Sequence, residues 1–205
     1  MMKVILASSS PFRKELLSKL GVDFNTNSPD IDETRLPKET PSQLVYRLSE
    51  EKAKEVAKRE DGLIIASDQV ATLEAGNRPT DEILCKPHTH ENAVKQLQKS
   101  SGKTVTFYTS LTLLNTNSNN INTIVETYKV IFKKLTGEQI ENYLNKEKPY
   151  NCAGSFKSEA LGVSLFERLE GNDPNTLIGL PLIQLVDMLK EEGFDVLSNI
   201  STIDT

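Results

Sequence analysis

A chain of 205 residues is long enough for one large α/β domain or for two lobes around a cleft. Its net charge of −5 argues against a sequence-independent grip on DNA, which needs a basic surface, so we expect no nucleic acid polymer as a partner. Cys85 and Cys152 form no Cys-x-x-Cys pair, which argues against a structural zinc site. No apolar run reaches membrane-spanning length and no signal-peptide core opens the chain, so we expect a cytoplasmic protein without membrane contact.

The amino-terminal segment has the pattern of a strand followed by a capped helix. A short apolar strand over residues 3–7 leads into Ser8, and Ser10 is suited to cap a helix over residues 11–20 that begins with proline. Arg13 and Lys14 stand in the first turn of that helix. Serine hydroxyls, free helix N–H groups and two nearby cations together favour a phosphate site, although a solvated helix end would have the same residues.

The next feature is an acidic loop over residues 28–34, which contains Asp30, Asp32 and Glu33. Clustered carboxylates after a proline are common in solvated loops. They are also the oxygen ligands that a hard cation such as Mg²⁺ prefers. The local pattern leaves both interpretations open.

Thr40 and Pro41 open a helix that we expect to run to about Lys58. Lys52 falls on the apolar stripe of this helix, between Leu48 and Val56. A lysine in such a position usually extends its amine to the rim of the core. If the rim borders a ligand site, the amine points at the ligand.

A run of apolar residues over 62–66 predicts a strand that is buried on both faces. Asp68 follows at its carboxyl end, and ligands of open α/β sheets bind outside the carboxyl ends of strands. We therefore favour a catalytic or metal-binding Asp68 over an aspartate that only forms a turn.

The remaining elements follow in order. We expect a loose loop over 72–84, a helix over 90–100 capped by Thr89, a long antiparallel hairpin of 103–114 with 121–132, a helix from Thr136 to about 146, a ligand-facing loop over 152–159, a short helix from Asp173 to Gly179, a last helix over 181–192 and a frayed tail beyond Phe194. His88 and His90 stand at a helix start without a third ligand, so any acid–base work must fall to carboxylates, lysines or a metal-bound water.

Six motifs in the same order resemble the Maf family of nucleoside triphosphate pyrophosphatases, from Lys3 to about Gly193. They are Ile5–Arg13 (ILASSSPFR), Asp32–Thr34, Glu51–Ala53, Ser67–Val70, Lys86–Pro87 and Ala153–Phe156. The resemblance implies a single domain over 1–205 with a Maf/ITPase-like α/β fold, in which an elongated mixed sheet with flanking helices forms two lobes around a central cleft and residues from about 195 form a flexible tail.

The resemblance also implies an activity. Such an enzyme cleaves a nucleotide between its α- and β-phosphates with a divalent metal (Mg²⁺, Mn²⁺ or Co²⁺), and a homodimer is the family-based expectation. Asp68 matches the catalytic acid, taken as proton acceptor, and four residues match phosphate and metal residues: Arg13, Glu33, Lys52 and Lys86. Glu33 with Asp68 would hold the metal, and the cations would neutralise charge on the phosphate oxygens. Which carboxylate acts as base and which as ligand stays open.

Within the family, residues 67–69 and 154–159 resemble the subgroup that acts on 7-methyl-GTP. The alternatives are the dTTP and UTP subgroup, a broad-specificity pyrophosphatase, and a nucleotide-binding regulator of cell division. If the substrate is 7-methyl-GTP, Phe12 would stack on the cationic base, and Glu159 would accept from its ring N–H and exocyclic amine. Gln69 would add a contact to the base or the sugar. Phe12 packed in the core and a solvated Glu159 are the structural alternatives.

Overall fold

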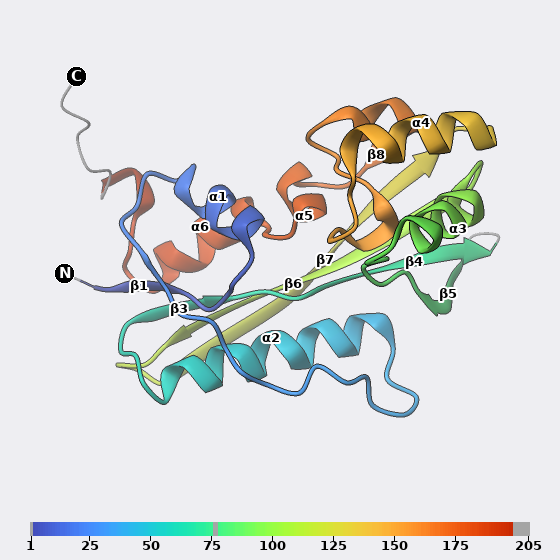
Figure 1. The fold of residues 1–205 in the computed structure, drawn as a ribbon. Coiled ribbons are helices and arrows are strands. Elements are labelled where there is room, and N and C mark those ends of the chain that lie inside the picture. Colours follow the sequence, from blue (N-terminus) through green and yellow to red (C-terminus); the bar gives the residue numbers. More distant parts are fainter. Residues whose placement is uncertain (1, 76–77, 199–205) are drawn as a thin grey trace, which may run out of the picture. The chain divides into compact units, whose positions relative to one another are not determined.

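The computed structural model describes residues 2–75 and 78–198. The strands join one mixed sheet with the strand order β2-β1-β3-β6-β4-β5, in which β7 pairs with β6 and β8 with β7 (Figure 1). The strands are β1 Val4–Leu6, β2 Asn25–Thr26, β3 Leu63–Ala66, β4 Gln69–Ala75, β5 Arg78–Ile83, β6 Thr104–Asn115, β7 Asn120–Phe132 and β8 Phe166–Glu170. The helices are α1 Pro11–Ser18, α2 Pro41–Ala57, α3 His90–Ser100, α4 Gly137–Glu147, α5 Pro174–Ile178 and α6 Leu182–Glu191, with 3-10 turns η1 Ala153–Ser155, η2 Leu161–Leu165 and η3 Val196–Ser198. The expected α/β fold with a mixed sheet and flanking helices is confirmed.

The chain divides into two compact units. Unit 1 consists of Met1–Gln69, Thr109–Glu126 and Gly179–Thr205, and unit 2 of Val70–Tyr108 and Thr127–Ile178. Each unit is therefore assembled from segments that are distant in the sequence.

Unit 1 is built around the short strand β3. Strand β1 pairs with β3 and with β2 in parallel, and β3 pairs antiparallel with the end of β6, so that Leu63 lies opposite Asn115. Helix α2 packs against β3 (Figure 1). It begins with a capping box, in which the Thr40 side chain accepts from the N–H of Gln43 and the Gln43 side chain accepts from the N–H of Thr40. The predicted start of this helix is thus confirmed.

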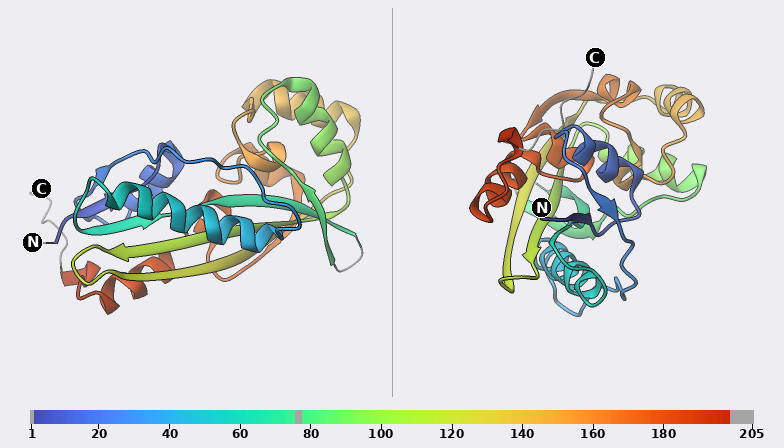
Figure 2. Two further views of the ribbon diagram at one scale, coloured as in Figure 1. Left: turned by 90° about the horizontal axis from the view of Figure 1, so that it is seen from below. Right: turned by 90° about the vertical axis from the view of Figure 1, so that its left-hand side faces the viewer.

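Unit 2 has its own aromatic core. Phe156 stands edge-on to three rings, those of Phe107, Phe132 and Phe166, with centroid distances of 4.9 to 5.6 Å. Helices α3 and α4 lie side by side in this unit (Figure 2). Edge-to-face ring pairs of this kind stabilise a core beyond the area they bury.

Two expectations from the sequence need correction. The segment 72–84 is not a loose loop, because β4 and β5 pair antiparallel within it, with residues 76–77 outside the described part. At the carboxyl end, Val196 is buried and opens η3, so ordered structure continues past Phe194 to Ser198. The expected flexible tail otherwise lies outside the described residues.

Candidate active site

Asp68 lies where the sequence places it, two residues beyond the end of β3. Its backbone is fixed from both sides by Ser110: the Asp68 N–H donates to Ser110 Oγ at 2.9 Å, and the Ser110 N–H donates to the Asp68 carbonyl at 2.9 Å. These bonds use only the main chain of Asp68. Its carboxylate takes no part in them, and the side chain is 10% exposed.

Lys52 joins two carboxylates. Its Nζ lies 2.6 Å from Asp68 Oδ1 and 2.8 Å from Glu33 Oε1, and the lysine side chain is only 7% exposed. The ammonium therefore does not extend to solvent as such lysines usually do. A buried charge of this kind persists because opposite charges and hydrogen bonds compensate its desolvation.

The two carboxylates occupy different environments. The side chain of Glu33 is 60% exposed, whereas that of Asp68 is 10% exposed. Glu33 comes from the loop between β2 and α2, and Asp68 comes from the end of β3. An exposed acid beside a buried one would offer a cation one ligand that solvent reaches and one that the core holds in place.

Arg13 is held toward the same pair of acids. Its Nε donates to the Gly179 carbonyl at 2.9 Å, and Ser67 Oγ donates to the same oxygen at 2.9 Å. Burial lowers the pKa of Arg13 below its ordinary value, while the charges of Asp68 and Glu33 raise it. Because an arginine starts from so high a pKa, the guanidinium stays charged and adds a second cation to the site.

The start of α1 forms as predicted. Ser10 caps the helix, its Oγ accepting from the Arg13 N–H at 3.4 Å, and the Ser10 N–H donates to Ser8 Oγ at 3.1 Å. Ser8 is buried and Ser10 half-buried. Both hydroxyls serve the turn as acceptors and keep their own protons for donation, so a phosphate role for them remains a prediction.

Phe12 and Gln69 also belong to unit 1. Phe12 is half-buried, so it is not a fully buried core residue. Gln69 Nε2 donates to Thr109 Oγ1 at 2.9 Å, which fixes the orientation of its amide. A contact of either residue with a base remains a prediction.

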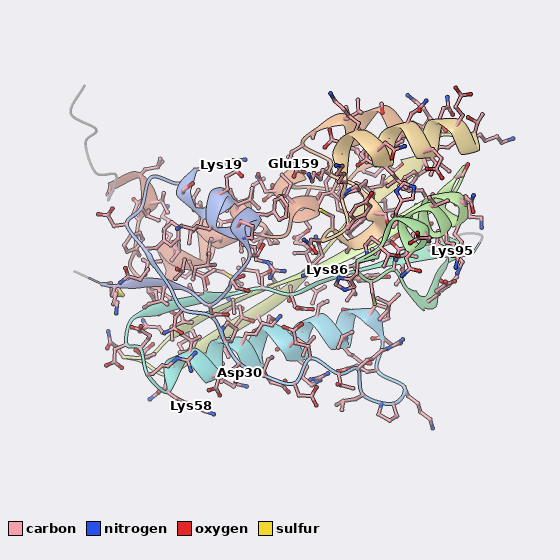
Figure 3. The ribbon with its side chains drawn as sticks, viewed as in Figure 1. Lys19, Asp30, Lys58, Lys86, Lys95 and Glu159 are labelled. Atoms are coloured by element: carbon pink, nitrogen blue, oxygen red, sulfur yellow. The ribbon has the colours of Figure 1, made fainter. Side chains whose placement is uncertain are left out.

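Lys86 and Glu159 belong to unit 2, and both are exposed (Figure 3). Their charges act on Cys152: burial raises the pKa of this thiol, Glu159 raises it further, and Lys157 and Lys86 lower it. The structure thus groups Lys86 with Glu159 around Cys152 in unit 2. It brings Arg13, Glu33, Lys52 and Asp68 together in unit 1. The functional roles of both groups of residues remain predictions.

The loop 152–159 is less exposed than the sequence suggests. Ser155 is fully buried and its Oγ donates to Gln96 Oε1 at 2.6 Å, and Phe156 sits in the aromatic core. Its residues from 157 to 159 are half-buried or exposed. We conclude that the first half of this segment anchors unit 2 and that a ligand-facing role is left to its second half.

The sequence analysis assigns no role to three groups that support the site: Ser67, Ser110 and the Gly179 carbonyl. Ser67 stands directly before Asp68 in one of the six motifs, so its position could have indicated a supporting role. Gly179 gave no such indication, because its carbonyl meets Arg13 across 166 positions and Ser67 across 112.

The donor set fits one class of metal. The described residues hold no group of three or more His, Cys, Asp or Glu that could bind an ion. Glu33 and Asp68, however, converge on one ammonium, so two carboxylates face the same positive charge. Mg²⁺ and similar ions are commonly held by one or two carboxylates plus substrate oxygens and water, and these residues fit that pattern.

The α/β class of the fold is shared with two solved structures. A HAM1 protein from Coxiella burnetii aligns with a TM-score of 0.53 at 14% identity, over 93% of this chain and 100% of that one. The Ham1 protein of Staphylococcus aureus aligns with a TM-score of 0.54 at 15% identity, over 93% and 99%. Identities this low support the fold alone.

The family follows from the sequence comparison. The model of the Maf family, described as Maf-like protein, matches residues 3–192, and the chain belongs to this family. Three relatives are named 7-methyl-GTP pyrophosphatase. They come from Nitrosococcus oceani (53% identical, 95% of each chain), Aliivibrio fischeri (53%, 95% of this chain and 98% of the relative) and Colwellia psychrerythraea (52%, 99% of each). Among the described residues no helix has the length and apolar character needed to cross a membrane.

Proposed function

We propose that this protein hydrolyses 7-methyl-GTP to 7-methyl-GMP and pyrophosphate, and so removes a non-standard nucleotide. The relatives that are 52–53% identical over nearly the whole chain carry this activity in their names. The observation that carries the chemistry is Lys52 held between Asp68 and Glu33. That arrangement supplies acids for water activation and a cation for phosphate in one place.

In the proposed reaction, a water oxygen attacks the α-phosphorus, the bond from that phosphorus to the bridging oxygen breaks, and pyrophosphate leaves. One of the two carboxylates, Asp68 or Glu33, accepts the proton of the attacking water. Lys52 and Arg13 are the cations beside them, and they offset the negative charge that grows on the phosphate oxygens. Lys86 is proposed for the same task from its motif.

A divalent metal is the cofactor expected for this family, and Mg²⁺, Mn²⁺ or Co²⁺ is proposed here. Glu33 and Asp68 would hold it. When bound, such an ion polarises phosphate oxygens and lowers the pKa of a bound water. Lys52 would then neutralise those oxygens of the two carboxylates that do not bind the ion.

Recognition of the base is proposed from the chemistry of 7-methylguanine, which is a cation. An aromatic face attracts a cationic ring more strongly than a neutral one, and the half-buried Phe12 is proposed for this contact. The exposed Glu159 is proposed to accept from the ring N–H and the exocyclic amine, and Gln69 to contact base or sugar. A homodimer and a cytoplasmic location, where nucleoside triphosphates are used, complete the proposal.

Assays with a panel of four nucleotides test the proposed function. Pyrophosphate release from 7-methyl-GTP, GTP, dTTP and UTP is measured with Mg²⁺ or Mn²⁺, and the highest kcat/KM is expected for 7-methyl-GTP. Equal values for all four would favour a broad pyrophosphatase, and a preference for dTTP and UTP would favour that subgroup. Nucleotide binding without release from any of them would favour a regulator.

A further inference from the structure

Arginines fasten the loop that carries Glu33 to helix α2 and to the turn that follows this helix. This loop covers residues 27–40, between β2 and α2, and within it no helix or strand forms among the described residues (Figure 3 labels Asp30 on it). At its start, Arg59 Nη2 donates to the Ser28 carbonyl at 2.7 Å. At its far side, Arg47 binds both ends of the stretch from Thr34 to Glu39.

The contacts of Arg47 are those of a clamp. Its Nε and Nη2 donate to the two carboxylate oxygens of Glu39 at 2.7 and 3.0 Å, and Nη2 also donates to the Thr34 carbonyl at 3.1 Å. Its Nη1 donates to Glu51, one turn further along α2, at 3.1 Å. A fork of donors matched to a carboxylate gives geometric specificity that a lysine lacks.

Glu39 completes the clamp from within the loop. Its side chain is 8% exposed, and its Oε2 accepts from the Leu36 N–H at 2.9 Å while its carbonyl accepts from Arg35 Nε at 2.8 Å. The Glu39–Arg47 pair therefore ties the loop backbone at Thr34 and at Leu36 to α2. Thr34, the residue next to Glu33, is one of the tied positions.

We propose that Arg47 and Glu39 are positioning residues for Glu33. Glu33 is 60% exposed on a loop without regular structure, yet its carboxylate must stay beside Lys52 of α2. Arg47 of the same helix holds the neighbouring carbonyl, so the acid and the lysine share one rigid support. The catalytic meaning of this clamp rests on the proposed function, whereas its structural part does not.

The test uses Arg47→Lys, which keeps the charge but loses the fork, and Glu39→Gln as a second variant should the first fail to fold. The matched control is Lys58→Gln at the carboxyl end of α2 (Figure 3), which removes an exposed cation paired with Glu55. Amide hydrogen exchange is followed in residues 28–36 and, as an internal reference, in β3. We expect exchange in the loop to rise about tenfold in the variants but not in the control, with β3 unchanged.

A mutant cycle then tests the link to catalysis. Arg47→Lys should lower kcat/KM about tenfold in the wild-type background but less than about twofold in a Glu33→Gln background, because its effect runs through Glu33. Equal losses in both backgrounds, or unchanged exchange in the loop, would overturn the proposal. If the wild type released pyrophosphate from no nucleotide, the proposed function would fail while the exchange result still decided whether the clamp holds the loop.

Discussion

Replacing Asp68 with asparagine should separate folding from turnover. Asparagine has nearly the same shape, and its Oδ1 can still accept from Lys52, which lies 2.6 Å from the carboxylate oxygen. The two main-chain bonds to Ser110 do not involve the side chain at all. What the variant loses is the negative charge and the capacity to take a proton.

The two effects differ in size. Loss of the charge from one hydrogen bond in a site that is 10% exposed costs about 1–3 kcal/mol of stability, against about 5–15 kcal/mol for a typical domain. Loss of the acid–base function should lower turnover about 10²- to 10⁴-fold, which corresponds to about 2.7–5.4 kcal/mol of activation free energy. The variant should therefore remain folded and be nearly inactive.

Pyrophosphate release from 7-methyl-GTP and denaturant unfolding of the same preparation are the two measurements. Asp61→Asn, at an exposed position before β3, is the matched control and should leave both unchanged. A wild-type kcat/KM in folded Asp68→Asn would refute the catalytic assignment of this residue. An unfolded variant would instead refute the view that Ser110 holds the main chain independently of the carboxylate.

Three further outcomes are expected. EDTA should abolish activity and Mg²⁺, Mn²⁺ or Co²⁺ should restore it, because Glu33 and Asp68 are proposed to hold the metal; full activity in metal-free buffer would contradict this. Glu159→Ala should lower kcat/KM for 7-methyl-GTP by about 10- to 100-fold relative to UTP, and an equal loss for both nucleotides would argue against base recognition. The hydrogen bond from Arg47 lowers the pKa of Glu39 below its ordinary 4.5, so the stabilisation from this pair is present above that pH and is lost as the pH falls through the lower folded-state pKa. Unfolding of wild type and Glu39→Gln across pH 7 to 3 should show a stability difference that narrows in acid, and a constant difference would contradict the assignment.

The helix starts were predictable from local chemistry. Ser10, Thr40, Thr89 and Thr136 each cap the helix that the sequence assigns to them, because capping depends on residues three positions apart. The position of Asp68 was equally local, since it needed only a buried strand and its end. The position of Lys52 on the buried face of its helix was predicted from the helical spacing of the apolar residues around it.

The hairpin of β4 and β5 was not predictable in the same way. A charged Glu74 in a short polar stretch argues for a loop, yet the strand tolerates it because Thr106 Oγ1 donates to it at 2.7 Å and Lys129 Nζ lies 2.9 Å away. Both partners are far along the chain. Likewise, Phe156 lay in a stretch of small polar residues that favoured a surface loop, and only the rings of Phe107, Phe132 and Phe166 explain its burial.

The shared oxygen of Gly179 has a consequence for the order in which the chain is made. Arg13 and Ser67 are synthesised early, but the carbonyl that accepts from both belongs to a residue 166 and 112 positions later. Domains gain structure from the amino terminus during synthesis, yet this site can form only after Gly179 has been synthesised. A chain that ended before Gly179 would carry Arg13, Glu33, Lys52 and Asp68 without the acceptor that orients its arginine.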